Sequence, residues 1–143
     1  MAVNVVIGSQ WGDEGKGKFV DIFAEKSDVV VRYNGSGGAA HTVVNEYGKF
    51  SLHLLPCGVF NPKTKILITN GVMIEPELLL KEINDVEKVG VSLKGRLYIS
   101  PRCHLVFPYH KMLDRATNAL FAKDSKTSPT TGRGNGPVHA DKI

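Results

Sequence analysis

The sequence predicts an α/β fold with a mainly parallel sheet and a P-loop-like, glycine-rich phosphate-binding loop. Two short β-branched runs, Val3–Ile7 and Val29–Tyr33, carry apolar residues on both faces, which is typical of buried parallel strands. A glycine-rich loop and a stretch with apolar residues at helical spacing, 19–26, lie between them. Strand, glycine-rich turn, helix and strand in this order form a βαβ unit.

The composition is that of one ordinary globular domain. With 143 residues, 42% hydrophobic and 22% charged, the chain can bury a core and is not of the disordered class. Its net charge of +4 is too mild to indicate nucleic-acid binding. Cys57 and Cys103 have no short spacing, which excludes a disulfide scaffold and a Cys-based zinc site. No targeting signal or membrane span is visible, so we expect a cytoplasmic protein that binds neither nucleic acid nor membrane.

The elements that follow the βαβ unit are predicted from hydrophobic periodicity and from the glycines and prolines that interrupt it. They are a hairpin over 42–55, strands over 65–69 and 96–100, and helices over 75–89 and 107–122. The first of these helices has acids near its start and Gly90 after its end, and Pro108 must lie in the first turn of the second. Glycines and prolines interrupt any period in 123–143, which is expected to be mostly loop.

The strongest local feature is the glycine-rich loop Gly12–Lys18. Between a strand and a helix, such glycines let backbone N–H groups turn inward, and the helix N-terminus adds positive potential, which together form a phosphate cradle. The loop satisfies the G-x-x-x-x-G-K spacing of a P-loop, but Phe19 stands where a P-loop has the Ser or Thr that binds Mg²⁺. Asp13 is then the obvious oxygen ligand for the metal. A solvated Gly/Lys turn is the competing interpretation.

Two later loops carry similar chemistry. Gly35–Thr42 follows the second strand, so it should lie beside the first loop at the C-terminal edge of the sheet, where open α/β sheets bind ligands. Its His41 could donate a hydrogen bond to a phosphoryl or carbonyl oxygen, although a single histidine is more often structural. The segment 130–137 combines hydroxyls, Arg133 and alternate glycines, which suit phosphate contacts. Its composition alone favours a flexible linker.

These motifs resemble the adenylosuccinate synthetase family in sequence and in order. Ser9–Lys18 resembles the N-terminal signature of that family, and the resemblance covers essentially the whole chain. The further matching stretches are 30–33, 41–44, 52–56, 71–72, 109–110 and 130–134. The family implies a GTP-dependent ligase of AMP biosynthesis, which joins IMP and L-aspartate to give adenylosuccinate, GDP and phosphate.

The resemblance also implies a mechanism. Asp13 would remove the N1 proton of IMP and ligate Mg²⁺, one ion per site, and the 6-oxygen of IMP would attack the γ-phosphate of GTP. His41 would act as acid and stabilise charge during that transfer, after which L-aspartate displaces phosphate. A carboxylate within a phosphate cradle suits both roles of Asp13. Family members are expected to be homodimers.

The ligand contacts of the family carry over position by position. Those to GTP fall on Gly12, Asp13, Glu14, Gly15, Lys16, Gly17, Lys18, Ala40, His41 and Thr42. Those to IMP fall on Asp13, Glu14, Gly15, Lys16, Gly38, Ala39, Ala40, His41 and Thr131. The metal is expected on Asp13 and on the backbone carbonyl of Ala40.

Several residues depart from the family pattern, and each departure bears on substrate affinity. Gly38 replaces an Asn that contacts IMP, and Ala40 carries a Cβ that would penalise a positive φ in its loop. Pro129 replaces a usual Gly, and Asn135 replaces an apolar residue.

The chain is also much shorter than the family enzymes. We expect residues 1–143 to be the N-terminal part of a single synthetase domain, as a fragment, a split gene product or an incomplete stretch of a longer chain. A catalytically inert nucleotide-binding module is the alternative function. A generic P-loop GTPase is disfavoured by Phe19 and by the absence of an Asn-Lys-x-Asp motif.

Overall fold

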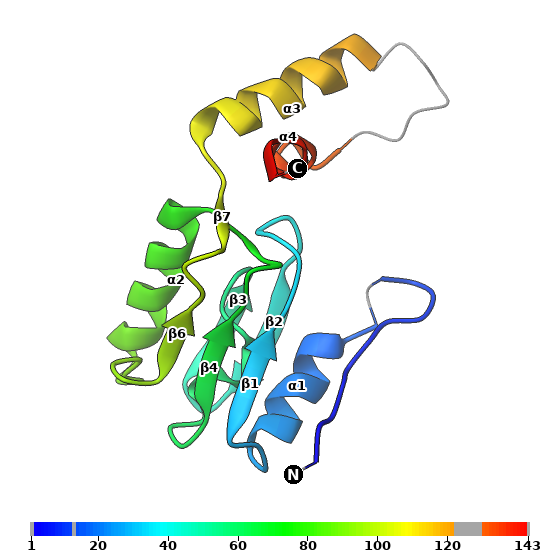
Figure 1. Cartoon of the computed structure of the whole chain (residues 1–143). Helices are drawn as coiled ribbons and strands as arrows, with labels where there is room; N and C mark the ends of the chain where they lie inside the picture. The colour runs from blue at the N-terminus through cyan, green and yellow to red at the C-terminus, as the bar shows by residue number, and fades with distance from the viewer. Residues whose placement is uncertain (1, 13, 122–129, 143) are drawn as a thin grey trace.

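The computed structural model describes residues 2–12, 14–121 and 130–142. Its centre is a three-stranded parallel sheet in the order β1-β4-β6 (Figure 1). Two smaller sheets accompany it, an antiparallel hairpin of β2 and β3 and a short parallel pair of β5 and β7. The strands are β1 (Val29–Arg32), β2 (His41–Asn45), β3 (Gly48–Leu52), β4 (Lys65–Ile68), β5 (Met73–Ile74), β6 (Leu97–Ile99) and β7 (His104–Leu105).

The helices are α1 (Lys16–Ala24), the 3₁₀ turn η1 (Cys57–Phe60), α2 (Pro76–Lys88), α3 (Pro108–Phe121) and α4 (Asn135–Lys142). The two long helices α2 and α3 begin and end close to their predicted positions, whereas η1 and α4 were not predicted. α2 has Pro at its first position, an acid in its first turn and Lys88 in its last turn, as the helix dipole favours. The predicted α/β class with a parallel sheet is therefore confirmed, and so are the hairpin and the two long helices. No described helix is long and apolar enough to cross a membrane.

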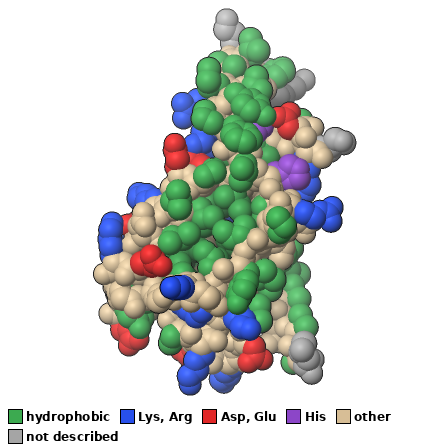
Figure 2. All heavy atoms as spheres, turned by 60° about the vertical axis from the view of Figure 1, so that its left-hand side comes forward, with side chains coloured by type: hydrophobic (Ala, Val, Ile, Leu, Met, Phe, Trp, Pro, Cys, Tyr) green, Lys and Arg blue, Asp and Glu red, His purple; other side chains and the backbone are tan. Residues whose placement is uncertain are grey.

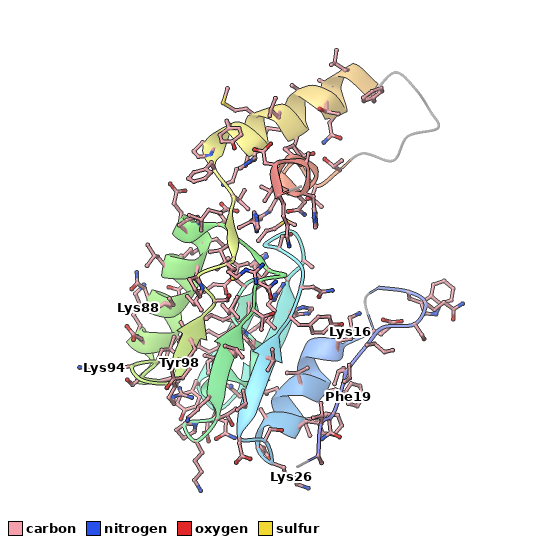
Figure 3. All side chains as sticks on the ribbon, in the orientation of Figure 1. Lys16, Phe19, Lys26, Lys88, Lys94 and Tyr98 are labelled. Atoms are coloured by element: carbon pink, nitrogen blue, oxygen red, sulfur yellow. The ribbon has the colours of Figure 1, made fainter. Side chains whose placement is uncertain are left out.

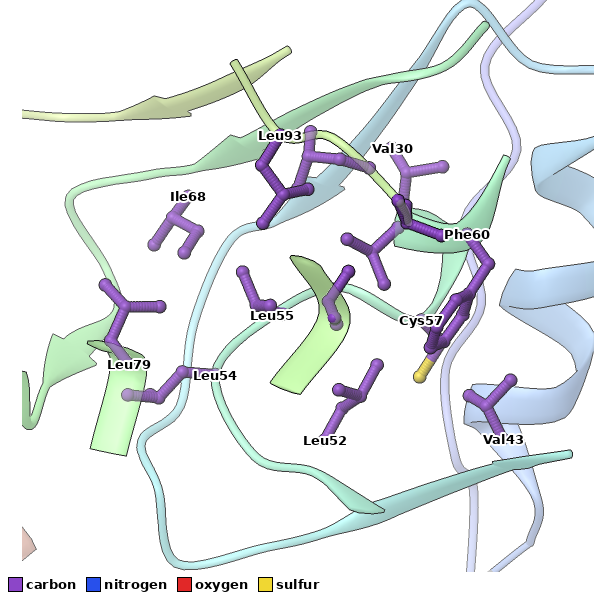
Figure 4. Close-up of a cluster of buried hydrophobic side chains, with 14 of the residues drawn as sticks. Val30, Val43, Leu52, Leu54, Leu55, Cys57, Phe60, Ile68, Leu79 and Leu93 are labelled. Carbon is purple, nitrogen blue, oxygen red and sulfur yellow. The ribbon is translucent and has the colours of Figure 1, made fainter. Parts of the chain in front are cut away.

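The main core lies on one face of the parallel sheet. Val30, Ile66 and Ile68 point inward from β1 and β4 and pack against the segment 52–60 and the apolar side of α2 (Figure 4). Leu54 is completely buried there. Burying side chains of this size stabilises a fold by about 1.5–3 kcal/mol each, so this cluster fixes the positions of the loops that leave the sheet.

The opposite face of the sheet is apolar and exposed. Val29 and Val31 of β1 are 46% and 45% exposed, and Tyr98 of β6, which lies on the same face, is 48% exposed. Figure 2 shows hydrophobic side chains gathered across the middle of one side of the molecule and along its upper extension. Contiguous apolar surface of this kind marks an interaction surface in a soluble domain.

The predicted strand Val3–Ile7 is wrong. These residues form no regular structure, and Val3, Val5 and Ile7 are 81%, 67% and 70% exposed. A strand that is apolar on both faces needs a covering layer on each face of its sheet. The described sheet has such a layer on one face only, so pairing at its β1 edge would leave half of this run in water. The predicted first βαβ unit therefore lacks its first strand.

The prediction that 123–143 is mostly loop is also wrong for its described end, where α4 lies. Pro137 falls in the first turn of α4, where its missing N–H costs no helical hydrogen bond. Val138 is 1% exposed and packs with Met73 and Val106 in a second small core. One apolar side chain at a tertiary contact thus outweighs the weak local preference of the segment. Residues 122–129, with the departure at Pro129, lie outside the described residues.

Candidate functional site

Three loops converge on a cavity of about 870 Å³ beyond the C-terminal end of β1. Gly12, Lys16 and Gly17 reach it from the first loop, and the segment 35–41 reaches it from the second. Thr131 and Asn135 line it from the third. The prediction that the first two loops meet at the C-terminal edge of the sheet is confirmed for the described residues, and the third loop joins them there.

The first loop is organised around the carboxylate of Glu14. Its Oε1 accepts hydrogen bonds from the backbone N–H groups of Ser9, Gln10 and Trp11 at 3.1, 2.9 and 3.1 Å. Its Oε2 pairs at 3.0 Å with the ammonium of Lys16, which stands at the N-terminal end of α1 (Figure 3). The N–H of Gln10, the Lys16 ammonium and the N–H of Trp11 lower the pKa of Glu14 to about 2. Glu14 therefore holds the shape of its own loop as an anion.

Gly17 lets α1 approach the second loop closely. A Cβ at this position would lie 2.8 Å from the Cβ of His41 and 2.9 Å from the sulfur of Cys57. Gly17 is buried and does not have a positive φ. The absence of a side chain at Gly17 therefore lets the start of α1 and the first loop lie against His41.

The second loop is held by hydrogen bonds from β5 and from the end of β1. The carbonyl of Gly35 accepts a hydrogen bond from the N–H of Met73 at 2.9 Å, and the Ser36 carbonyl accepts one from Arg32 at 3.1 Å. Burial lowers the pKa of Arg32, against the opposing effect of Glu82. The Nε of Arg32 is buried and has no hydrogen-bond partner among the described residues. A buried donor without a partner is unfavourable, so this nitrogen is an exception to the otherwise satisfied polar groups near the cavity.

The third loop is held by a buried carboxylate of α3. Asp114 is 3% exposed; its Oδ1 accepts a hydrogen bond from the Thr130 hydroxyl at 2.7 Å, and its Oδ2 accepts one from the N–H of Gly134 at 2.8 Å. His110 and Tyr109 bind a single carboxylate oxygen of Asp141 at 3.0 and 2.6 Å, which ties α3 to α4. Thr131 thus has a fixed support on both sides.

A second hollow of about 470 Å³ adjoins the third loop and is mainly basic. Lys111, Arg115 and Arg133 line it with one acid, Glu75, which pairs with Lys111 and lies 3.8 Å from Arg133. Thr131 lines both this hollow and the larger cavity. The two hollows therefore meet at Thr131, and the excess positive charge of the smaller hollow favours an anionic ligand beside this residue.

Most of the predicted site residues lie at the cavity, but not all of them line it. Gly12, Lys16, Gly17, Gly38, Ala39, His41 and Thr131 line it. Glu14, Gly15, Lys18, Ala40 and Thr42 are neighbours in sequence that do not. Asp13 lies outside the described residues. The backbone at Ala40 does not have a positive φ, so its Cβ meets no penalty in this loop.

Arg32 and Cys57 also line the cavity, and motif reasoning gave neither a role there; Asn135, noted above only as a departure from the family pattern, lines it too. The position of Arg32 at the end of β1 is the signal that could have identified it, because ligands bind beyond the carboxyl ends of parallel strands. Burial raises the pKa of Cys57 to about 12, so its thiol stays uncharged and unreactive at neutral pH. Asn135 gives no such local signal.

Comparison with known proteins shows the family to which the chain belongs. The family model described as adenylosuccinate synthetase matches residues 5–143. The chain belongs to the adenylosuccinate synthetase family. The adenylosuccinate synthetase of Chlorobaculum tepidum is 48% identical over 99% of the chain, and that of Wolinella succinogenes is 47% identical over all of it. The resemblance found in the sequence is thereby confirmed.

A solved synthetase structure has the same fold. The fully ligated adenylosuccinate synthetase from Plasmodium falciparum matches 93% of this chain with a TM-score of 0.84 and 41% identity. The chain spans 31% of that structure, and 32% and 33% of the two bacterial relatives. It therefore corresponds to about a third of a family member. Two of the departures from the family pattern, Gly38 and Asn135, meet at the cavity.

Proposed function

We propose that the chain forms the N-terminal, nucleotide-binding part of an adenylosuccinate synthetase, a GTP-dependent ligase that joins IMP and L-aspartate. One observation carries the proposal. Three loops that are far apart in the sequence, each with phosphate-binding chemistry, share one cavity at the C-terminal edge of the sheet. This is where open α/β sheets bind nucleotides.

In this proposal the first loop holds the phosphates of GTP, from Gly12 to Lys18. Its Glu14 stays ionised and shapes the loop, and the N-terminus of α1 contributes positive potential. Asp13 takes the N1 proton of IMP, so that the 6-oxygen can attack the γ-phosphate of GTP. His41 donates to the oxygen that becomes negative in this transfer. The second loop, with Gly38 to Thr42, and Thr131 hold the two nucleotides in line.

The metal proposed for this site is Mg²⁺, one ion for each site. The chemistry of the donor set suits it, because a carboxylate and a backbone carbonyl are oxygen ligands and Mg²⁺ takes few protein ligands besides substrate phosphates. Asp13 and the carbonyl of Ala40 would hold it, and it would neutralise charge on the transferring phosphoryl group. Among the described residues, no group of three or more His, Cys, Asp or Glu is placed to hold a metal, so the ion would depend on the nucleotide for most of its ligands.

We also propose that residues 1–143 are one part of a single domain. The exposed apolar face with Val29, Val31 and Tyr98 is the surface that the rest of a synthetase domain would cover. A homodimer in the cytoplasm is the proposed working form of the complete protein.

The test is reconstitution. The chain is produced together with the segment of the Chlorobaculum tepidum relative that follows its matching third, and adenylosuccinate is measured with IMP, GTP, L-aspartate and Mg²⁺. We expect turnover by the pair and little or none by the chain alone, because most of the positioning of the substrates would be missing. Asp13→Asn should lower the rate by about 10²–10⁴. An inert nucleotide-binding module would bind nucleotide and give no product in any combination.

A further inference from the structure

The glycine at position 38 opens a space that the side chain of Asn135 enters. A Cβ at Gly38 would lie 3.0 Å from the Nδ2 of Asn135, 3.4 Å from the hydroxyl oxygen of Thr131 and 3.5 Å from that of Ser36. At 3.0 Å a Cβ contact is tighter than ordinary packing allows. The second loop at position 38 and the start of α4 at position 135 therefore use the same volume.

The amide of Asn135 is free to bind a ligand. It lines the cavity, and it makes no hydrogen bond to any other described residue. Of its neighbours, Ser36 is already engaged, because its hydroxyl accepts the N–H of Gly38 at 3.3 Å. A partly buried amide without a partner is unfavourable unless water or a ligand supplies one.

The backbone next to Asn135 holds this amide in place. Gly134 has a φ of 82°, its N–H donates to the buried Asp114 at 2.8 Å, and a Cβ on it would lie 2.9 Å from the backbone carbon of His110. The chain therefore enters α4 in one conformation, pressed against α3. The backbone from which the Asn135 side chain extends is therefore fixed, which limits the directions the amide can reach.

We propose that Asn135 is a substrate-contacting residue whose side-chain amide donates a hydrogen bond to a phosphoryl oxygen of the purine nucleoside monophosphate, from the space that Gly38 leaves open. The inference rests on the proposed function. Thr131, next to the amide, also lines the hollow that carries Lys111, Arg115 and Arg133. Excess positive charge on this side favours the phosphate end of the nucleotide over its base.

The geometry makes positions 38 and 135 interdependent. A side chain at 38 collides with Asn135, so Gly38→Asn alone should disturb the site. Removal of the Asn135 side chain creates room for that new side chain, and the second loop can then supply an amide from position 38. A double-mutant cycle over these two positions measures this coupling directly.

The experiment is a titration of the 143-residue chain with IMP, inosine and GTP, followed by NMR or calorimetry. Asn135→Ala should weaken IMP binding about five- to tenfold, the effect of one lost hydrogen bond, and leave inosine and GTP within about twofold. Asn84→Ala, an exposed asparagine on α2, is the matched control and should change nothing. Circular dichroism checks that each variant is folded.

The cycle gives the second readout. Gly38→Asn should weaken IMP binding by about tenfold or more, and Gly38→Asn combined with Asn135→Ala should recover most of that loss. If IMP binds but Asn135→Ala leaves its affinity unchanged, the role of Asn135 is overturned and the proposed function stands. An equal loss for inosine would overturn the phosphoryl contact. The same titrations are made with the chain reconstituted with its complementary segment, and if that pair binds neither IMP nor GTP, the proposed function fails and the inference fails with it.

Discussion

Gly17→Ala is the substitution that tests most directly how the first two loops are brought together. The new Cβ would lie 2.8 Å from the Cβ of His41 and 2.9 Å from the sulfur of Cys57. Ordinary contact begins at 3.4 Å, so the first pair must separate by about 0.6 Å. The sulfur of Cys57 can turn about its one side-chain torsion, but the Cβ of His41 is bonded directly to the backbone. The backbone of α1 or of β2 must therefore move.

The energetic cost follows from the packing. Forcing an extra methyl group into a well-packed contact costs about 1–3 kcal/mol, whereas Ala in place of a helical Gly stabilises by up to about 1 kcal/mol. The net loss in the free energy of unfolding for Gly17→Ala should be about 0–2 kcal/mol. Gly136→Ala is the matched control, because Gly136 is also helical and a Cβ there would meet nothing within 4 Å. It should gain about 0.5–1 kcal/mol.

The difference between the two variants isolates the packing effect. Urea unfolding monitored by circular dichroism should place Gly17→Ala about 1–3 kcal/mol below Gly136→Ala. The imidazole signals of His41 in NMR spectra should shift in the first variant and not in the second. In the reconstituted enzyme, we expect roughly a tenfold loss of rate for Gly17→Ala, because a misplacement of 1 Å can cost about 100-fold. Equal stability of the two variants, with an unmoved His41, would refute the close approach of α1 to this residue.

Three further predictions concern buried or engaged carboxylates. The pKa of Glu14 is lowered to about 2, so its contribution to the order of the first loop is fully present above pH 4.5 and is lost as the pH falls toward 2. The fluorescence of the single tryptophan should follow this loss, and Glu14→Gln should remove its pH dependence. Asp114→Asn should cost about 1–3 kcal/mol and speed hydrogen exchange in 130–134. Glu82→Gln should cost a similar amount, measured by urea unfolding, because Glu82 accepts the backbone N–H groups of 53–55 from inside the core.

Elements with their own boundary signals could be predicted well from the sequence. The hairpin of β2 and β3 forms around the Glu46-Tyr47-Gly48 turn, and Gly48 has the positive φ that such a turn needs. α2 begins at a proline and is followed by Gly90, also at positive φ. These signals act within a few residues, so pattern alone locates the ends of both elements.

Elements that depend on a distant partner could not be predicted. The run Val3–Ile7 has the composition of a buried strand, but its burial needs a layer on the outer face of the sheet that the described residues do not supply. α4 has few apolar residues, and the burial of Val138 against Met73 and Val106 is what fixes it. In both cases the deciding contact is tertiary, and local composition points the other way.

The candidate site divides along the same line. The two positive-φ glycines of the first loop, Gly12 and Gly15, follow from the motif, because a loop that turns its N–H groups inward requires such backbone angles. Gly17 and Gly38 have no positive φ, and what they contribute is space, to His41 in one case and to Asn135 in the other. The backbone angles of such a motif can thus be predicted from the local sequence. The room that its other glycines leave for residues distant in the sequence cannot. Substitutions at the two spacing glycines should therefore be tolerated only together with changes in the residues that face them.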